Sequence, residues 1–207
     1  MDDDDMRRGQ LSTHRAYSVP VATAAGAAMI PLAALAARWA GVSLRLPEDV
    51  CCTIVKVLMQ GAGAGGMIGG QLLDLAAEGR TLSPSRLDAI HSAKTGALIA
   101  ASVKLGAIAA EAGASQADAF GRYGERIGLA FQIMDDVLDV EGSSADLGKT
   151  AGKDAADDKP TFVSRFGVDG ARGQAEACID YAKEILGEAK LDGRLPEIAE
   201  WTISRKS

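Results

Sequence analysis

The stretch Phe131-Gln132-Ile133-Met134-Asp135-Asp136-Val137-Leu138-Asp139 ends in three carboxylates within five residues. On a helix of about 3.6 residues per turn, Gln132, Asp135, Asp136 and Asp139 share one face, and hydrophobic residues cover the other. Carboxylates one turn apart repel each other, so the cluster disfavours a helix unless a cation lies between the oxygens. The pattern therefore indicates a helix that carries a metal site. A solvated acidic helix end is the simpler alternative.

Lysines return soon after these acids, in the segment Gly148-Lys149-Thr150-Ala151-Gly152-Lys153-Asp154 and again at Lys159. Mg²⁺ prefers hard carboxylate oxygens and shares phosphate oxygens, and lysines can offset the remaining phosphate charge. The segment is not a Walker loop, because the required glycine spacing is absent. The acids and lysines together predict one site for Mg²⁺ and a phosphate group.

The composition sets the background for this site. The 207 residues are 47% hydrophobic but only 4% aromatic, which favours an Ala-rich helical protein with one substantial core. A net charge of −6 argues against nucleic acid or an anionic membrane surface as a partner. The three cysteines form no Cys-x-x-Cys pair, which is typical of reduced thiols in a cytoplasmic protein.

Residues 18–37 contain no charge and follow several arginines, as the body of a signal sequence would. Four aspartates precede those arginines, however, and the stretch is mostly Ala with Pro20 and Pro31. Alanine contributes little to membrane transfer. We therefore expect a buried helix that begins near Pro20 rather than a membrane span.

The remaining pattern predicts an all-α chain without competing strands. Helices are expected over residues 21–41, 47–78, 84–112, 116–140 and 170–190, with a loop over 141–158 and a short segment after Pro196. Residues 61–70 contain six glycines, which cost a helix several kcal/mol relative to Ala and predict a loop.

These features together resemble the short-chain trans-prenyl diphosphate synthases, a polyprenyl synthetase family of which the bacterial farnesyl diphosphate synthases are the nearest. The stretch from Phe131 is similar to the second aspartate-rich motif, and the lysine segment follows it in family order. Three further segments also match, namely Lys94-Thr95-Gly96, Gly69-Gly70-Gln71-Leu72-Leu73-Asp74-Leu75, and Asp2-Asp3-Asp4-Asp5-Met6-Arg7-Arg8-Gly9. The last of these resembles the tail of the first aspartate-rich motif.

The resemblance implies the isoprenoid synthase helical bundle without its N-terminal helices, as one domain over residues 1–207 that covers the C-terminal two thirds of the family fold. Contrary to composition, it implies helix through the glycines at 61–70, which would permit close packing near the ligand. It also implies condensation of isopentenyl diphosphate with an allylic diphosphate to a short-chain product such as farnesyl diphosphate.

The resemblance further implies roles for particular side chains. The metal ligands for Mg²⁺ would be Asp2, Asp135, Asp136 and Asp139. The residues that stabilise or orient the leaving diphosphate would be Lys94, Thr95, Gln132, Lys149 and Lys159. The substrate-binding residues would be Arg7, Arg8, Gln71 and Asp74.

Simpler structural interpretations are also possible for these residues. A lone lysine inside a helix, such as Lys94, usually extends to solvent. Arg7 and Arg8 could be surface charges, and Asp74 an ordinary exposed acid. The isolated histidines, His14 and His91, are expected at the surface or as capping residues without a catalytic role.

Two departures from the family pattern bear on activity. Only Asp2 remains of the spaced acids in the first motif, and Ser18-Val19-Pro20-Val21-Ala22-Thr23-Ala24-Ala25-Gly26 replaces the expected helix. We therefore expect weak or no activity from this chain alone. Three interpretations are open: a synthase whose true start lies upstream, an inactive gene fragment, or a noncatalytic partner of a complete synthase. A homodimer or a pairing with a complete synthase is expected.

Overall fold

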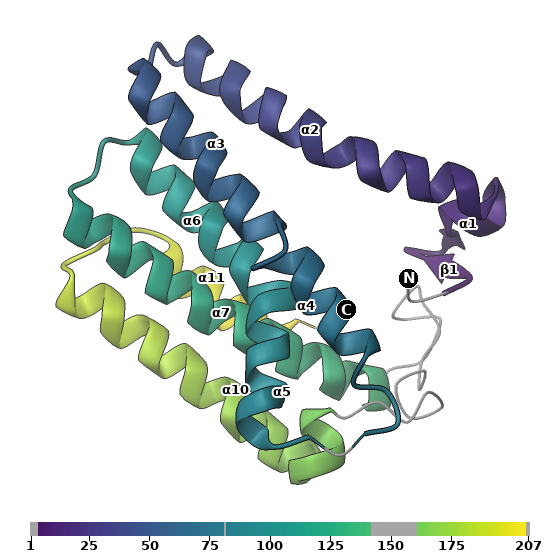
Figure 1. The fold of residues 1–207 in the computed structure, drawn as a ribbon. Helices are drawn as coiled ribbons and strands as arrows, with labels where there is room; N and C mark the ends of the chain where they lie inside the picture. Colours follow the sequence, from purple (N-terminus) through teal and green to yellow (C-terminus); the bar gives the residue numbers. More distant parts are fainter. Residues whose placement is uncertain (1–3, 81, 142–160, 206–207) are drawn as a thin grey trace.

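The computed structural model describes residues 4–80, 82–141 and 161–205 (Figure 1). Helices account for nearly all of the regular structure in these ranges. They are α1 (Thr13–Ala16), α2 (Val19–Ser43), α3 (Glu48–Ala62), α4 (Met67–Leu75), α5 (Pro84–His91), η1 (Ser92–Gly96), α6 (Ala97–Ala109), α7 (Ala114–Glu141), α10 (Phe162–Glu188) and α11 (Leu195–Ser204). This arrangement confirms the all-α prediction.

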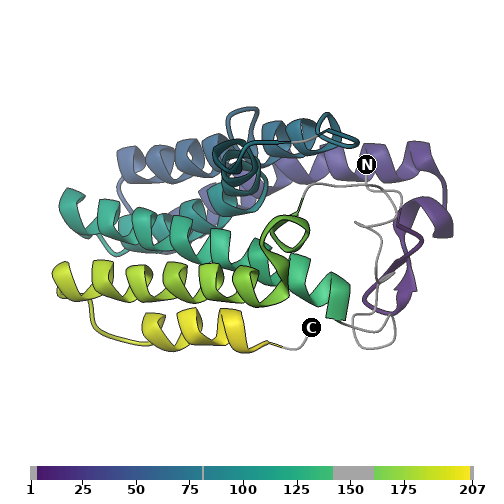
Figure 2. The same cartoon turned by 90° about the horizontal axis from the view of Figure 1, so that it is seen from below.

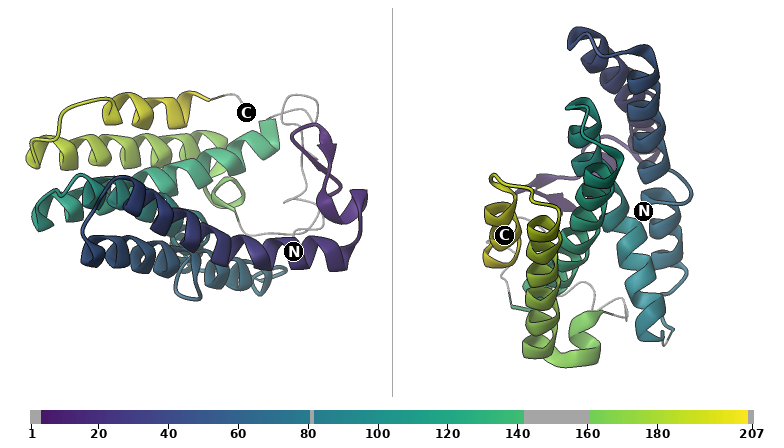
Figure 3. Two further views of the ribbon diagram at one scale, coloured as in Figure 1. Left: turned by 90° about the horizontal axis from the view of Figure 1, so that it is seen from above. Right: turned by 90° about the vertical axis from the view of Figure 1, so that its left-hand side faces the viewer.

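The helices form three layers (Figures 2 and 3). Helices α6 and α7 lie in the middle, α10 and α11 cover one side, and α2, α3 and α4 lie on the other. The main core lies between α7 and α10, where large aliphatic side chains such as Ile133, Met134, Ile179 and Ile185 are almost fully buried. Tyr123 adds a polar tie, because its buried hydroxyl donates to the carbonyl of Leu195 at 2.6 Å.

Helix α10 begins earlier than expected, because local signals at Thr161 start it. The Thr161 side chain accepts from the Ser164 N–H, and the Ser164 side chain accepts from the Thr161 N–H, which forms a capping box. A kink then occurs at Gly167, whose φ of 71° lies in the left-handed region that glycine adopts at little cost. The amphipathic pattern becomes regular only after this kink, which is why the sequence predicts a start near residue 170.

The glycine-rich segment is a short break between two helices. Helix α3 ends at Ala62 and α4 begins at Met67, so only the residues between them are irregular. The loop predicted from composition is correct for the residues between the two helices, and the helix implied by the resemblance is correct for the residues on either side. The expectation that its glycines permit close packing is confirmed, since a Cβ on Gly61 would lie 2.8 Å from that of Ala101 on α6.

The segment from residue 84 to 109 is helical throughout, as predicted, but it contains one widened turn. Between α5 and α6, the five residues of η1 form a π-helical turn. Such turns inside longer helices are rare and occur often at functional sites. Lys94 and Thr95 lie in this turn.

The expectation that the Ala-rich N-terminal helix is buried was wrong. Of α2, only Gly41 is buried, close to the Cys51 side chain of α3. The physical reason is that α2 packs mainly against α1 and α3, along one side (Figure 1). By length and composition, Val19–Ser43 and Glu48–Leu75 could each cross a membrane.

A small β-hairpin at the N-terminus was not predicted. Strand β1 (Met6–Arg7) pairs antiparallel with β2 (Gln10–Leu11). Arg8 and Gly9 form the turn with φ of 52° and 74°, the positive values that two-residue hairpins favour. An ion pair between Arg15 of α1 and Asp5, with an Nε–Oδ1 distance of 2.5 Å, ties the hairpin to the helix that follows.

Candidate active site

Three elements meet where the predicted motifs lie: α4, η1 and α7. Two glycines allow their backbones to approach without side chains between them. A Cβ on Gly70 of α4 would lie 2.2 Å from the backbone nitrogen of Lys94, and one on Gly128 of α7 would lie 2.4 Å from Cα of Gly96. Both distances are far below any normal contact. These glycines therefore fix η1 between the two helices.

The first polar contact at this junction joins α4 to η1. The Nζ atom of Lys94 lies 2.7 Å from Oδ2 of Asp74, and both side chains are mostly buried. The structure thus brings together two residues that the sequence separates by 20 positions. Lys94 does not extend freely into solvent, and Asp74 is not an ordinary exposed acid, so both simpler readings are wrong.

A second set of contacts runs from η1 through α7 to α10. The Thr95 hydroxyl donates to Oε1 of Gln132 at 2.8 Å, and Nε2 of Gln132 donates to Oδ1 of Asp136 at 3.2 Å. The other oxygen of Asp136 accepts the backbone N–H of Phe162 at 2.9 Å. This chain of hydrogen bonds links the predicted diphosphate-orienting residues to the start of α10.

The three aspartates at the carboxyl end of α7 have different surroundings. Asp136 and Asp139 are buried, at 3% and 5% exposure, whereas the Asp135 side chain is 34% exposed. Asp136 satisfies an N–H at the first turn of α10, where a carboxylate is also favoured by the helix dipole. Within the described residues no three acid, His or Cys side chains form a group that could hold a metal alone.

The donor set nevertheless fits Mg²⁺ of the kind that is shared with a ligand. Mg²⁺ usually binds one or two carboxylates and completes its coordination with water and substrate phosphates. Asp135 of α7 offers a partly exposed hard oxygen donor, and the neighbouring turn η1 carries the mostly buried cation of Lys94. Water or a phosphate-bearing ligand would complete a site of this composition.

His91 was expected at the surface or as a cap and is instead buried next to this site, so that expectation was wrong. It ends α5, and its ring lies 5.5 Å from that of Phe162. Burial lowers the pKa of His91 to about 4; the charge of Lys94 adds to this effect and Asp74 opposes it. His91 is therefore a neutral packing residue at neutral pH. His14 matches its expectation more closely, since its ring contacts the Ser12 hydroxyl just before α1.

Several predicted site residues lie apart from this junction or cannot be placed. Asp2, Lys149 and Lys159 lie outside the described residues. Arg7 and Arg8 are exposed on the hairpin, which lies at the same end of the molecule as the carboxyl end of α7 (Figures 1 and 2). Gln71 is half-buried on α4, one turn before Leu75.

Arg205, which was not predicted as a site residue, contacts the acid motif from the end of α11. Its Nη2 atom lies 3.3 Å from Oδ1 of Asp135. The two residues are 70 positions apart, so no local pattern could have indicated the contact.

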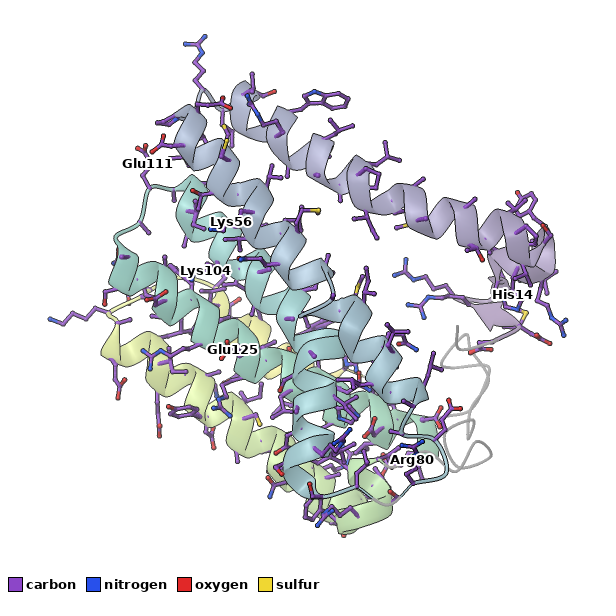
Figure 4. The ribbon with its side chains drawn as sticks, viewed as in Figure 1. His14, Lys56, Arg80, Lys104, Glu111 and Glu125 are labelled. Carbon is purple, nitrogen blue, oxygen red and sulfur yellow. The ribbon has the colours of Figure 1, made fainter. Side chains whose placement is uncertain are left out.

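An apolar groove of about 810 Å³ extends from α4 toward α2. Met67 and Ile68 of α4 line one end, one turn from Gln71, and Met29 and Ile30 of α2 line the other. A second groove of about 870 Å³ is more polar and includes Lys104 of α6 and Glu125 of α7 (Figure 4). None of the predicted site residues lines the second groove.

Comparisons with known proteins agree with this geometry. A family model described as "Polyprenyl synthetase" matches residues 1–192. The chain is 37% identical to farnesyl diphosphate synthase of Haemophilus influenzae over 100% of its own length and 70% of the relative's. It is 40% identical to farnesyl diphosphate synthase of Escherichia coli over 99% of its length and 70% of the relative's.

A dimethylallyltranstransferase of Fischerella ambigua is 40% identical, and the chain covers 59% of that protein. Among solved structures, a geranyltransferase of Helicobacter pylori complexed with magnesium and isoprenyl diphosphate has a TM-score of 0.81. It is 27% identical, and the match covers 99% of this chain and 66% of that one.

Proposed function

The chain belongs to the polyprenyl synthetase family, and we propose that it condenses isopentenyl diphosphate with a short allylic diphosphate to give a product such as farnesyl diphosphate. The observation that carries this proposal is the junction of α4, η1 and α7. There the Asp74–Lys94 pair and the Thr95–Gln132 hydrogen bond lie beside the acids of α7. The names of the relatives supply the substrate class.

The proposed reaction begins with heterolysis of the allylic C–O bond, which leaves an allylic carbocation and a diphosphate. The double bond of isopentenyl diphosphate attacks the cation, and the new cation loses a proton to the released diphosphate. Charge separation is the difficult step, so fixed cations beside the leaving group lower the barrier most. Lys94 supplies such a cation, and its position is set by Asp74.

Other residues of this site would orient the diphosphate. The Thr95 hydroxyl and the Gln132 amide are already aligned by their mutual hydrogen bond. Mg²⁺, when bound, would stabilise the negative charge that develops on the diphosphate. Asp135 is the proposed ligand for this metal, and Asp139 lies one turn further along α7. We propose that Asp136 instead fixes the start of α10, because both of its oxygens already accept hydrogen bonds.

The apolar groove suits the hydrocarbon part of an allylic substrate. It begins one turn from Gln71 and is lined almost entirely by aliphatic side chains. Burial of apolar surface contributes about 25 cal/mol per Å², so a prenyl chain in this groove would add to the affinity that the diphosphate provides.

We further propose that the chain pairs with a second copy of itself in the cytoplasm. Exposed apolar side chains follow α2, among them Leu32, Leu35 and Trp39. Large exposed apolar patches usually mark an interaction surface. Sedimentation should then give a dimer, and Leu35→Glu should shift it toward monomer.

The test of the enzymatic proposal uses the purified chain with labelled isopentenyl diphosphate, geranyl diphosphate and Mg²⁺. Formation of prenyl product is expected, and Asp135→Ala should reduce it at least tenfold, because it removes a metal ligand. Asp118→Ala is the matched control, since Asp118 is an exposed acid on the same helix and pairs only at the surface with Lys104. Equal turnover in the two variants, or none in the unaltered chain, would contradict the proposal.

A noncatalytic partner subunit is the alternative function, and the comparisons favour a synthase instead. The same assay separates the two. A partner subunit would form no product alone but would change the rate of a complete synthase when the two are mixed.

A further inference from the structure

Arg205 occupies an unusual position for an arginine near the end of a chain. It directly follows the last residue of α11, yet only 7% of its side chain is exposed. Its guanidinium carbon lies 3.8 Å from the centre of the Phe131 ring. A guanidinium stacked this closely on an aromatic face is held in a defined plane.

Two hydrogen bonds use this fixed plane. The Nη2 atom of Arg205 donates to the backbone carbonyl of Phe131 at 3.0 Å and to Oδ1 of Asp135 at 3.3 Å. The ring, the carbonyl and the carboxylate all belong to the same turn of α7. The arginine therefore binds this turn through its shape and hydrogen-bond acceptors as well as through the negative charge of Asp135.

We propose that Arg205 is a positioning residue for Asp135, and that it orients this carboxylate for the divalent metal that carries the substrate's diphosphate. The inference rests on the proposed function, in which Asp135 is the metal ligand. Asp136, the next acid in the motif, has an analogous support, because its Oδ2 accepts the backbone N–H of Phe162. The two adjacent acids are thus held by α11 and α10 respectively.

The charge of Arg205 and its orienting contact with Asp135 predict opposite changes in metal affinity when Arg205 is replaced. A cation beside a metal ligand repels the metal, so loss of the Arg205 charge alone should tighten metal binding. Loss of an orienting contact should weaken it, because partners behind metal ligands typically contribute tenfold or more in affinity. Weaker metal binding in the variant therefore indicates an orienting role, and tighter binding indicates a charge effect alone.

The experiment measures Mn²⁺ binding to the full chain in the presence of inorganic diphosphate, by electron paramagnetic resonance of free Mn²⁺. Arg205→Gln should raise the Kd about tenfold. Arg205→Lys should also weaken binding, because an ammonium cannot stack and donate in the same plane. Arg194→Gln should leave the Kd unchanged, since Arg194 at the start of α11 is 86% exposed and pairs with Glu197.

A double-variant cycle shows whether Arg205 acts through Asp135. In an Asp135→Asn background, Arg205→Gln should cause no further loss of Mn²⁺ affinity. The same loss in both backgrounds, or tighter binding in Arg205→Gln, would overturn the proposal. A fall in affinity for diphosphate without metal would also overturn it, because Arg205 would then contact the ligand directly.

Thermal unfolding of the metal-free variants provides a readout that does not depend on the proposed function. If Arg205 supports Asp135, the Tm of the double variant should match that of the less stable single variant. Absence of Mn²⁺ binding in the unaltered chain would count against the proposed function, and this thermal cycle would then decide the Arg205–Asp135 contact alone. If the losses of Tm in the Arg205 and Asp135 variants add in the double variant, the two residues do not support each other and the proposal is refuted.

Discussion

Helices α2 and α7 show opposite relations between composition and burial. Helix α7 contains eight charged residues, yet 13 of its residues are buried. Helix α2 contains Arg38 as its sole charge, and only Gly41 is buried. The more apolar helix is the less buried one. A high apolar content alone does not show that a helix is buried. A helix with one apolar and one charged face is more informative, because the apolar face is the one that packs against the core.

A matched pair of methionines tests this contrast most strongly. Met134 of α7 is 2% exposed and Met29 of α2 is 68% exposed. Met134→Ala should lower the free energy of unfolding by about 2–5 kcal/mol, because it leaves a cavity in the core. Met29→Ala should change it by about 0.5 kcal/mol or less. Urea denaturation followed by circular dichroism measures both.

If Met29→Ala also destabilised the chain, then α2 would be more buried in solution than its exposure in this structure indicates. A loss that grows with protein concentration would show that a second copy covers α2. A loss independent of concentration would show that α2 packs within the chain.

Acid should affect the packed region through His91. Its pKa is about 4 in the folded chain against an ordinary value of 6.5, so protonation favours the unfolded state. The stability due to neutral His91 is complete above pH 6.5 and is lost as the pH falls toward 4. The loss should reach about 3 kcal/mol. Thermal unfolding between pH 8 and pH 4 measures it.

The control for this pH effect is His91→Leu, which removes the titrating ring while filling a similar volume. Its Tm should fall less between neutral and acid pH than that of the unaltered chain. An identical pH profile for the two proteins would show that other groups cause the acid response.

A pair of glycines gives the smallest expected effects, and their signs differ. A Cβ on Gly128 of α7 would lie 2.4 Å from Gly96, whereas one on Gly26 of α2 would meet nothing within 4 Å. Gly128→Ala should destabilise the chain by about 1–3 kcal/mol through overpacking. Gly26→Ala should stabilise α2 by up to about 1 kcal/mol, because alanine favours a helix. Calorimetry of the two variants compares them, and a shared sign would undermine the contrast.

Much of the fold and part of the site could be predicted from the sequence, because the informative patterns were local. The acidic face of α7 is predicted from neighbouring residues, whereas the roles of Lys94 and Thr95 came from the family resemblance. The resemblance gave Asp74 a separate role toward the substrate, and the 2.7 Å contact between Lys94 and Asp74 was not predicted. The exposure of α2 could not be predicted, since burial depends on which elements lie nearby.

The roles of Asp136 and Arg205 also could not be read from spacing. Asp136 lies on the same helical face as the other acids, and only the position of Phe162, 26 residues later, shows what it binds. Arg205 reaches its partner across 70 residues. Long-range contacts of this kind leave no periodic pattern in the chain.

The glycine contacts at Gly70 and Gly128 have a consequence for how this protein can vary. At these points main chain meets main chain, so no side chain can be exchanged to compensate for a change in the neighbour. In a saturation mutagenesis map, every substitution at these two positions should destabilise the chain, and larger side chains more than Ala, while Gly26 accepts many. The spacing of the proposed site is therefore fixed by positions that contribute no functional group to it.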